Sequence, residues 1–598
     1  MPTPEAAAGQ ANEDRGSVDG VDGLRALSDW CMEQMGDLEA ARSNWNTHNQ
    51  EIAERLLPHR AHFTTGTSGV GYKTRGEKQT SKIYEARPAQ ALSRYVSIMD
   101  SMLTPQAQRW HGLRSPDEDL HDDQEVKEGL DTIAKYLFRV RYRYQSGFAY
   151  SVAEAYEENG AFGTGILYLG QDDFGLPYYR AIPLSEAYLA ADDYGRIDTL
   201  FRVYPMYARN IAKKYPAAVG RFPPALKEAI EKQPRKEFNI VHAVFPRADR
   251  DIGKLDKQNM EVAEVVLFKD DGTVLDVSGY REFPYAISRF ATSSGETYGR
   301  GPAAILLPDV KMVNEMAKEN IVATHQRNRP PLLAFRRNAM ARFSMVPGKL
   351  NYGALDKEGR ALVKPLETGA DPNAGDAAID RRMSTIDEGF FVSIMRVLSE
   401  HPNMTATQAM IIAQERGFEI GPRISRQQSE AHGPMITREI AILQRNAYIS
   451  REMIPEQIAE REGEYDIHYT APINKLQEQG QDGVAISRTL EMVGSMAEAD
   501  PGVLDHYDMD EVARMIPEIN GAPAKILRTI DEVEAKREAR AQEMAQQQQM
   551  AAAPGLAAAA KDGAQAADIA GVDLAGMTQN GLLPEDAGEG QDGGAFGA

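Results

Sequence analysis

A glycine-rich segment at residues 66–74 comes nearest to a known chemical motif in this chain. It approaches the phosphate-loop pattern G-x-x-x-x-G-K-[ST], in which consecutive backbone N–H groups and the lysine that follows them hold a nucleotide phosphate. Tyr72 separates Gly71 from Lys73, and no apolar strand precedes Gly66. We therefore expect an exposed loop here and no nucleotide site.

Two pairs of neighbouring aspartates are the candidates for metal-dependent chemistry. Such carboxylates could hold divalent cations in a nuclease, but neighbouring aspartates in glycine-rich runs are more often turn residues. We prefer the turn interpretation and keep a metal-dependent nuclease as the minor alternative. The residues concerned are Asp172, Asp173, Asp192 and Asp193.

The histidine and cysteine residues give weaker evidence for a metal site than the aspartates do. His59 and His62 are three residues apart without an apparent third ligand, so solvated loop histidines are the better interpretation. The single cysteine, Cys31, excludes an internal disulfide and a cysteine-cluster metal site. A zinc-protease motif, a nucleophile elbow and an intact phosphate loop are all missing from the sequence. The sequence thus predicts a protein without catalytic residues, metal or cofactor.

Basic residues concentrate in one segment of an otherwise acidic chain. The formal net charge is −21 at pH 7, yet no Asp or Glu occurs between Glu319 and Asp356. The basic segment could contact DNA phosphates or an acidic partner surface, and a solvated set of loops is an equally good interpretation. The candidate contact residues are Arg327, Arg329, Arg336, Arg337, Arg342 and Lys349.

A second basic cluster alternates with apolar and aromatic residues. Arg139, Arg141 and Arg143 are interleaved with Val140, Tyr142 and Tyr144. Basic residues interleaved with aromatics could contact nucleic acid. A solvated helix face, whose long side-chain stems cover apolar surface, is the preferred interpretation.

The element that precedes the basic segment is a long helix. A glycine-rich turn leads to Pro302 at the first helical position, and Pro330–Pro331 ends the helix. Pro308 is expected to restart or kink it. The uninterrupted part spans about 20 residues, or about 30 Å, as a thin amphipathic rod suited to packing beside like helices. The apolar stripe consists of Val310, Val313, Ala317, Ile321 and Thr324.

A second rod follows the basic segment. Residues 379–398 carry apolar side chains every three to four positions. Between the two rods, LLAF, GKLNYGAL and ALVKPLE are expected as short strands, which gives a rod–tip–rod layout. His401–Pro402–Asn403 then breaks the chain, and Thr405 begins another helix as a plausible cap. The stripe of the second rod is Ile379, Met383, Ile386, Phe390, Ile394 and Val397.

The remaining chain is helical at both ends and β-rich between them. Single helices are expected over 24–57, 83–103 and 525–550, two helices between 125 and 160 with a break near Gly147, and a long helix over 421–448 kinked at Gly433–Pro434. Residues 161–295 hold short β-rich runs split by Gly, Pro and Asp-Asp, with one helix near 208–215, and a further strand is expected at 466–471.

Length and composition bound the class of protein. A chain of 598 residues exceeds one compact core, so several domains or an elongated subunit are expected. The acidic N-terminus lacks the apolar run of a signal peptide, and no apolar stretch of about 18 residues predicts a membrane span. The net charge argues against a protein that coats nucleic acid, which would carry a basic face.

Three blocks of sequence, taken in order, resemble the head-to-tail connecting (portal) proteins of short-tailed phages. The first is AFGTGILYLG at 161–170, and the third is HPNMTATQAMIIAQERGFEIGPRISRQQSEAHGPMITREI at 401–440. The second block surrounds the first rod and comprises Tyr298–Pro302, Leu307–Lys311, Asn314–Met316 and Pro330–Leu333. The similarity extends over residues 24–448, and the order of the blocks is more specific than any one of them.

The resemblance implies a mixed α+β fold, predominantly helical, of the portal type, with a wing, a stem, a clip and a C-terminal helical crown or barrel. In this chain the division would be a disordered N-terminus at 1–23, a wing at 24–295 with its β-rich module at 161–295, a stem helix at 296–328, a clip at 329–378, a second stem helix at 379–400, a channel loop and long wing helix at 401–480, a crown or barrel at 481–550 and a disordered tail at 551–598.

The resemblance also implies a function. A portal protein forms a homo-dodecameric ring at one capsid vertex, assembled in the host cytoplasm, and double-stranded DNA passes through its channel during packaging and ejection. Its partners are copies of itself, a tail adaptor protein, the terminase large subunit, and the major capsid and scaffold proteins, and it has no membrane partner. The channel loop would comprise His401, Pro402, Asn403 and Met404. Another phage structural protein, such as a tail or scaffold component, is the alternative.

Overall fold

The structure, a computed structural model, divides the chain into two compact units, Met1–Gly521 and Ala522–Ala598. It describes residues 21–64, 80–120, 123–248, 256–334, 358–366, 372–392, 421–459, 465–474 and 532–544, together with residues 250, 254, 344, 346, 348–352, 354–355, 489, 492–494, 507–508, 510, 512–514 and 528. In the second unit the described residues 532–544 are helical, inside the helix expected over 525–550.

The first unit begins with four helices at the predicted places. α2 (Val21–Leu56) ends before Pro58, which opens a short 3-10 turn. α3 spans Arg87–Leu103, α4 Gln124–Arg141 and α5 Phe148–Phe162. Asp123 caps α4 by accepting hydrogen bonds from the backbone N–H groups of Glu125 and Val126, two donors that the first turn leaves unpaired. Gly147, with φ +72°, forms the expected break between α4 and α5.

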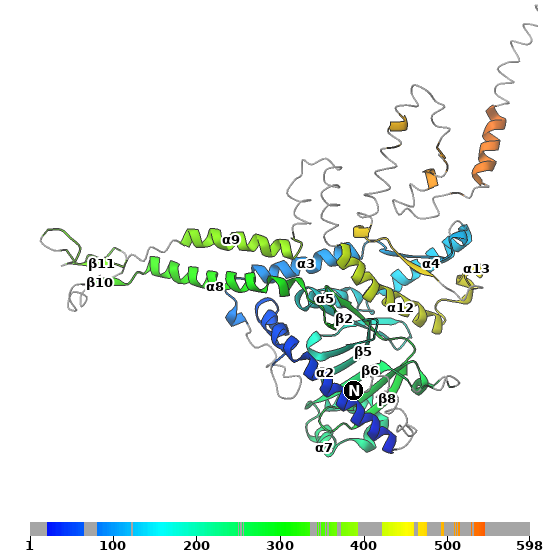
Figure 1. The fold of residues 1–598 in the computed structure, drawn as a ribbon, viewed down its shortest axis with the longest axis horizontal. Helices are drawn as coiled ribbons and strands as arrows, with labels where there is room; N and C mark the ends of the chain where they lie inside the picture. Colours follow the sequence, from blue (N-terminus) through cyan, green and yellow to red (C-terminus); the bar gives the residue numbers. More distant parts are fainter. Residues whose placement is uncertain are drawn as a thin grey trace, which may run out of the picture. The chain divides into compact units, whose positions relative to one another are not determined.

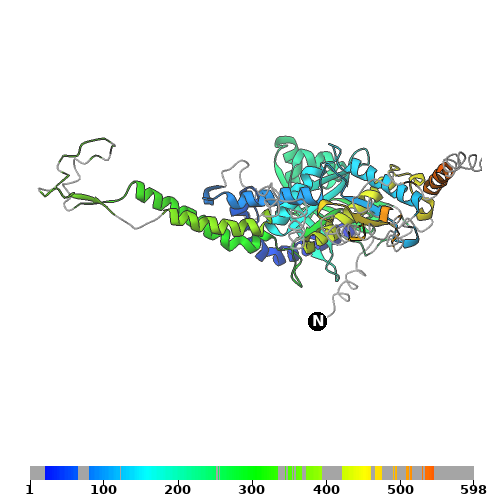
Figure 2. The same ribbon diagram turned by 90° about the horizontal axis from the view of Figure 1, so that it is seen from above.

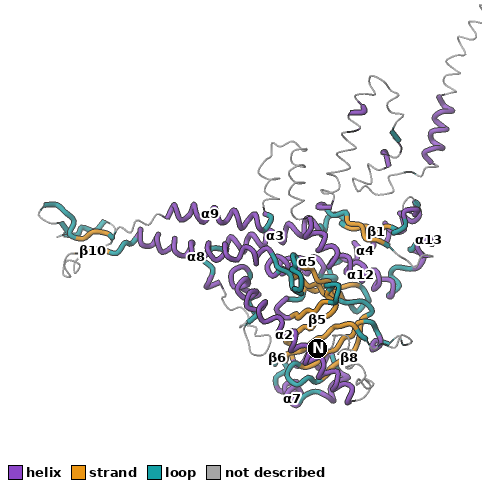
Figure 3. The backbone as a smooth tube through the Cα atoms, in the orientation of Figure 1, coloured by secondary structure: helices purple, strands orange, loops and turns teal. Residues whose placement is uncertain are grey.

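Two antiparallel sheets follow in the β-rich region (Figure 3). The three-stranded sheet has the order β3-β2-β9, and the five-stranded sheet has the order β4-β5-β6-β7-β8. One side of the five-stranded sheet packs against α2 and the other against α6 (Ala208–Lys214) and α7 (Pro224–Lys232), a helix that the sequence pattern did not predict. The strands are β2 (Thr164–Gln171), β3 (Pro177–Ala181), β4 (Ala187–Ala191), β5 (Ile197–Tyr207), β6 (Glu237–Pro246), β7 (Val262–Phe268), β8 (Val274–Tyr280) and β9 (Tyr285–Arg289).

The two predicted rods are helices that lie side by side (Figures 1 and 2). α8 spans Pro302–Asn328 and continues through Pro308. α9 spans Pro372–Gly389, so it begins seven residues before the predicted start at 379. It also ends nine residues before the predicted end at 398, because the chain turns at Phe390 and Phe391, the latter with φ +59°. Their contact is partly polar, because Arg382 donates to Asp309 at 2.8 Å and Asn320 donates to Asp376 at 2.6 Å.

The apolar stripes of both rods are largely confirmed. Val310, Val313 and Ala317 of α8 are buried, as are Met383, Ile386 and Phe390 from the second stripe. Ile321 is 46% exposed, Thr324 and Ile379 are half-buried, and Ile394 and Val397 lie outside the described residues. The predicted stripe therefore turns toward solvent in the last third of α8.

A small β-ladder connects the two helices. β10 (Leu332–Ala334) pairs antiparallel with β11 (Val363–Pro365), as the LLAF and ALVKPLE segments predicted. The prediction of a strand in GKLNYGAL is wrong for the described residues of that segment. They form turns and a single bridge between Leu355 and Ala361. The ladder is short, so it provides little core of its own.

The later part of the first unit contains a distorted helix and a distant strand pair. Residues 421–427 are helical, Gln428–His432 form a π turn, and α12 spans Gly433–Arg445. Pro434 has no N–H to donate to the preceding turn, which accounts for a distortion close to the predicted kink. β12 (Asp466–Tyr469) pairs with β1 (His111–Arg114), across more than three hundred residues. Among the described residues, no helix is long and apolar enough to cross a membrane.

Candidate functional site at the base of α8

The segment that leads into α8 crosses the segment that leads into β2, and the two backbones are in direct contact. The Gly299 N–H donates to the hydroxyl of Thr164 at 2.9 Å. Gly163 has φ +80°, and a Cβ added there would lie 2.3 Å from the backbone nitrogen of Gly301. A Cβ added at Gly299 would lie 2.1 Å from the carbonyl oxygen of Gly163. Glycine is therefore required on both sides of this crossing, which joins the first two sequence blocks.

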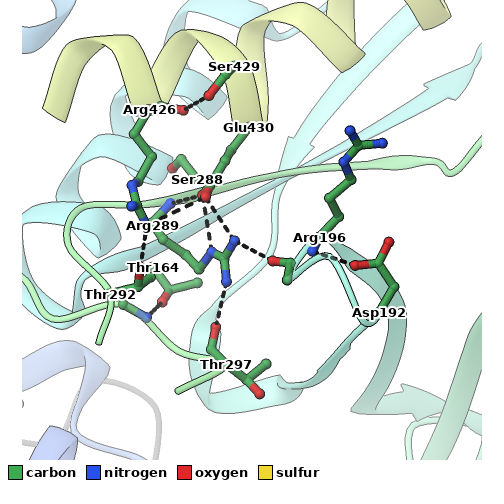
Figure 4. Close-up of polar contacts among 12 residues, drawn as sticks. Thr164, Asp192, Arg196, Ser288, Arg289, Thr292, Thr297, Arg426, Ser429 and Glu430 are labelled. Carbon is green, nitrogen blue, oxygen red and sulfur yellow. Dashed lines mark hydrogen bonds and ion pairs between the residues drawn. The ribbon is translucent and has the colours of Figure 1, made fainter. Parts of the chain in front are cut away.

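An ion pair brings the third block to the same place (Figure 4). The Arg289 guanidinium donates to both carboxylate oxygens of Glu430, at 3.1 and 2.8 Å, and the Arg289 backbone N–H also donates to Glu430, at 3.0 Å. The same guanidinium donates to the carbonyl oxygens of Gly195, at 2.8 Å, and Thr297, at 3.4 Å. Arg289 is 7% exposed. A buried charge with this many partners holds the elements around it in one arrangement.

Aromatic and basic residues attach β4 and α2 to the same base. The Tyr298 hydroxyl accepts a hydrogen bond from the Leu189 N–H at 3.0 Å, and burial raises the pKa of Tyr298. Arg300 lies over the Trp45 ring, 4.9 Å from its centroid. The hydrogen bond from Arg300 lowers the pKa of the Glu296 carboxyl. The base of α8 is thus fixed to three separate parts of the first unit.

A second buried network holds α12 through Glu439. Arg141 donates to Glu439 at 2.9 Å and contacts Nδ1 of His111 at 3.2 Å, while its guanidinium lies 4.6 Å from the Trp110 ring centroid. Burial opposes the charge on Arg141, but Glu439 raises the pKa of Arg141 above its ordinary value. Burial and the Arg141 charge lower the pKa of His432 to about 3, so His432 is neutral at pH 7.

These contacts correct the reading of the arginine–tyrosine cluster. Arg141 is fully buried and cannot contact nucleic acid, and Arg143 pairs with Asp172. Arg139 and Tyr144 are exposed, as a solvated helix face would have them. The cluster therefore serves mainly to hold α4 in the first unit.

The aspartate pairs occupy turns, as preferred. Asp172 accepts hydrogen bonds from the N–H groups of Phe174, at 2.9 Å, and Leu176, at 2.8 Å. Asp192 accepts one from the N–H of Arg196, at 2.7 Å. Among the residues that the structure describes, no group of three or more His, Cys, Asp or Glu side chains could hold a metal ion.

The predicted basic contact residues divide into two groups. Arg327, Arg329 and Lys349 are described and exposed. The other predicted contacts, Arg336, Arg337 and Arg342, and the predicted channel-loop residues His401, Pro402, Asn403 and Met404 lie outside the described residues. The structure adds exposed apolar side chains around the ladder that the charge pattern gave no reason to expect: Leu333, Val346, Leu350, Tyr352, Leu355, Leu362 and Leu366.

Sequence reasoning also missed the Arg289–Glu430 pair. The two residues are 141 positions apart, and single charged residues in a strand and a helix carry no signal of pairing. The sequence pattern predicts a turn at Gly299–Pro302 but contains no sign of its contact with Gly163. The only available signal was that both glycine-rich blocks occurred in the resemblance.

The chain is similar to known phage proteins over most of its length. The family model for bacteriophage head to tail connecting proteins matches residues 28–527. A probable portal protein of Bordetella phage BPP-1 is 26% identical over 520 residues, which cover 86% of this chain and 91% of that protein. The portal protein of Salmonella phage epsilon15 is 26% identical over 523 residues, with the same coverage of both chains. The matched span contains the glycine crossing, both paired helices and the ladder between them, and the chain belongs to the family of bacteriophage head to tail connecting proteins.

Proposed function

We propose that this protein is a portal subunit that forms a homo-dodecameric ring at one vertex of a phage capsid. Double-stranded DNA passes through the central channel of the ring during packaging and ejection. The observation that carries the proposal is the pairing of α8 with α9, joined by a small ladder and fixed at the base by the glycine crossing, in a member of this family.

In this proposal the parts of the chain have separate tasks. Residues 24–295 form the wing, α8 and α9 the stem, and the segment between them the clip. The stem then includes residues 372–378, which the sequence division gave to the clip. Residues 401–404 lie at the channel loop, and 481–550 form a crown or barrel.

The exposed surface of α8 suits contact with a neighbouring copy. Ile305 is 68% exposed, Met312 45% and Val322 41%, although the helix already packs against α9 on another face. Apolar side chains left exposed on a long helix favour side-by-side packing with a like helix. Head-to-tail contacts of this kind close into a ring when the rotation between copies closes.

The charge of the chain suits a channel through which DNA slides. Each contact between a phosphate and Lys or Arg adds to a salt-dependent grip on DNA. A chain with a formal net charge of −21 offers a weakly binding bore. The exposed Arg327, Arg329 and Lys349 lie near the ladder, where they serve docking of the terminase large subunit and then of a tail adaptor protein. ATP hydrolysis belongs to the separate motor, and the portal itself has no catalytic site.

Electron microscopy of the purified full-length chain tests the proposal. We expect negative-stain images to show rings with a central hole, and a cryo-EM map to place α8 and α9 around that hole. A compact single subunit under every condition of salt and concentration would overturn the proposal. A filled or open assembly without a hole would favour a tail or scaffold component.

A further inference from the structure

The hairpin of β4 and β5 ends in a rigid acidic turn, Asp192–Gly195, here called the acidic tip. The Gly195 N–H donates to the Asp192 carbonyl oxygen at 2.9 Å, and the Gly195 carbonyl accepts from Arg289, the residue that binds Glu430. Asp193 is exposed, and Tyr194 is 88% exposed. An aromatic side chain on a turn that is already fixed loses little conformational freedom on binding, which is typical of interface anchors.

The two aspartates of the acidic tip form no ion pair with another described residue. The Asp192 carboxylate accepts from the Arg196 N–H, but the Arg196 guanidinium points away from it (Figure 4). The similar turn Asp172–Gly175 differs in this respect, because Arg143 pairs with Asp172 there. Phe174 at that turn is also less exposed, at 71%.

A polar cavity of about 440 Å³, here called the arginine pocket, lies near the other end of the same hairpin. Three arginines contribute to its lining from separate elements: Arg60, Arg180 of β3 and Arg202 of β5. Tyr150, which is 65% exposed, and Tyr178 also line it. Glu154 and Glu186 line it as well, so its three arginines outnumber its carboxylates by one. The pocket therefore offers aromatic surface beside a net positive charge.

The three arginines of the pocket differ in their ion pairs. Arg60 pairs with Glu154 at 3.2 Å, and Arg202 pairs with Glu186 at 2.7 Å. Arg180 is exposed and makes no ion pair with any other described residue. A carboxylate that enters the pocket would meet the Arg180 guanidinium without displacing an existing partner.

The acidic tip cannot reach the arginine pocket of its own chain. The register pairs Ala187 with Arg202 at one end of the hairpin and Ala191 with Ile197 at the other. From Tyr194 to Arg202 is eight residues, or about 26 Å along a strand at about 3.3 Å per residue. The acidic tip and the arginine pocket therefore lie at opposite ends of one hairpin. This placement favours contact between two copies, in which the acidic tip of one copy meets the arginine pocket of the other.

From this arrangement we infer that the acidic tip of one copy binds the arginine pocket of the next copy in the ring. The Asp193 carboxylate pairs with Arg180 of the neighbour, and the Tyr194 ring packs against its Tyr150 and Tyr178. This inference rests on the proposed ring assembly and names the contact that sets the order of copies in the wing.

Cysteine cross-linking of the full-length chain tests the contact directly. Cys31, the one natural cysteine, is fully buried, so engineered thiols report the interface. In assembled rings of a variant with both Arg180→Cys and Asp193→Cys, we expect a bifunctional maleimide to give a ladder of covalent multimers on a denaturing gel. Each single variant should remain monomeric on the gel, because the contact joins unlike residues. The matched control combines Arg180→Cys with Asp173→Cys and should give no ladder.

Charge exchange provides the second measurement. Asp193→Arg and Arg180→Glu alone should each raise the protein concentration needed for assembly by about tenfold, and the combined variant should restore assembly. Rings seen by microscopy without a ladder, or a combined variant that assembles no better than the single ones, would overturn the contact. If the unaltered chain forms no rings at all, the proposed function fails instead, so the two failures are distinguishable.

Discussion

Replacing Gly163 by alanine tests whether the base of α8 depends on close backbone contact. The added Cβ would lie 2.3 Å from the Gly301 nitrogen, a separation that requires the two chains to move apart. Moving them apart breaks the hydrogen bond from Gly299 to Thr164, at 2.9 Å, and the one from the Phe290 N–H to the Gly163 carbonyl, at 2.9 Å. Each of these bonds contributes about 1 kcal/mol.

The structure supplies controls that separate backbone strain from the clash. Gly295 has φ +81°, almost the value at Gly163, but a Cβ there would meet no atom within 4 Å. Gly295→Ala should therefore cost only the positive φ, about 1–2 kcal/mol. Gly163→Ala adds the two hydrogen bonds and the local strain, so we expect a loss of about 4 kcal/mol or more. In Gly299→Ala the clash is with the Gly163 carbonyl, at 2.1 Å.

Urea unfolding followed by tryptophan fluorescence measures these differences. Trp45 lies against Arg300 and Tyr298, so its emission reports the base of α8. We expect the unfolding midpoint to fall only slightly in Gly295→Ala and strongly in Gly163→Ala and Gly299→Ala. If Gly163→Ala and Gly295→Ala differed by less than about 1 kcal/mol, the backbone contact would not be the reason for glycine at this crossing.

Three further predictions concern the clip, the buried network and pH. Reversing the charge at Arg336 and Arg337 should weaken binding of a tail adaptor in a pull-down assay while leaving rings visible by microscopy, and loss of the rings would contradict the clip assignment. Glu439→Gln leaves the Arg141 charge buried without its counter-ion and should lower the free energy of unfolding by about 3–5 kcal/mol in urea; an unchanged midpoint would refute that. The pKa of His432 falls from 6.5 to about 3 on folding, so between these values the unfolded chain binds a proton that the folded chain does not. Stability should therefore fall as pH drops below 6.5, and His432→Gln should flatten this part of the melting-temperature profile; parallel profiles would contradict the assignment.

Local signals predicted much of the fold. Pro302 after a glycine-rich turn placed the start of α8, and Pro330–Pro331 placed its end close to Asn328. Gly147 and the Asp192–Gly195 turn were located because glycine adopts positive φ with little cost. These features depend on residues close together in sequence, which is why a pattern can reveal them.

Other features depend on contacts that no local pattern contains. The start of α9 was placed too late because its apolar stripe begins at Ile379, whereas the helix starts at Pro372 with small and polar residues. α7 is only nine residues long, and it follows closely on the predicted helix near 208–215, so the pattern does not separate it. The Arg289–Glu430 pair and the β1–β12 ladder join distant parts of the chain, and Arg141 is buried against Glu439, a residue far away in sequence.

The crossing of Gly163 with Gly299 and Gly301 has a mechanical consequence. α8 is about 40 Å long, since its 27 residues rise about 1.5 Å each, and its part beyond Ala317 can act as a lever arm. At its base, main chain rests on main chain at the glycine crossing, and buried side chains from Ala303 to Ala317 also hold the first half of the helix in the core. A push at the far end of the lever is therefore passed to β2 and its sheet as torque, and is not absorbed at the joint.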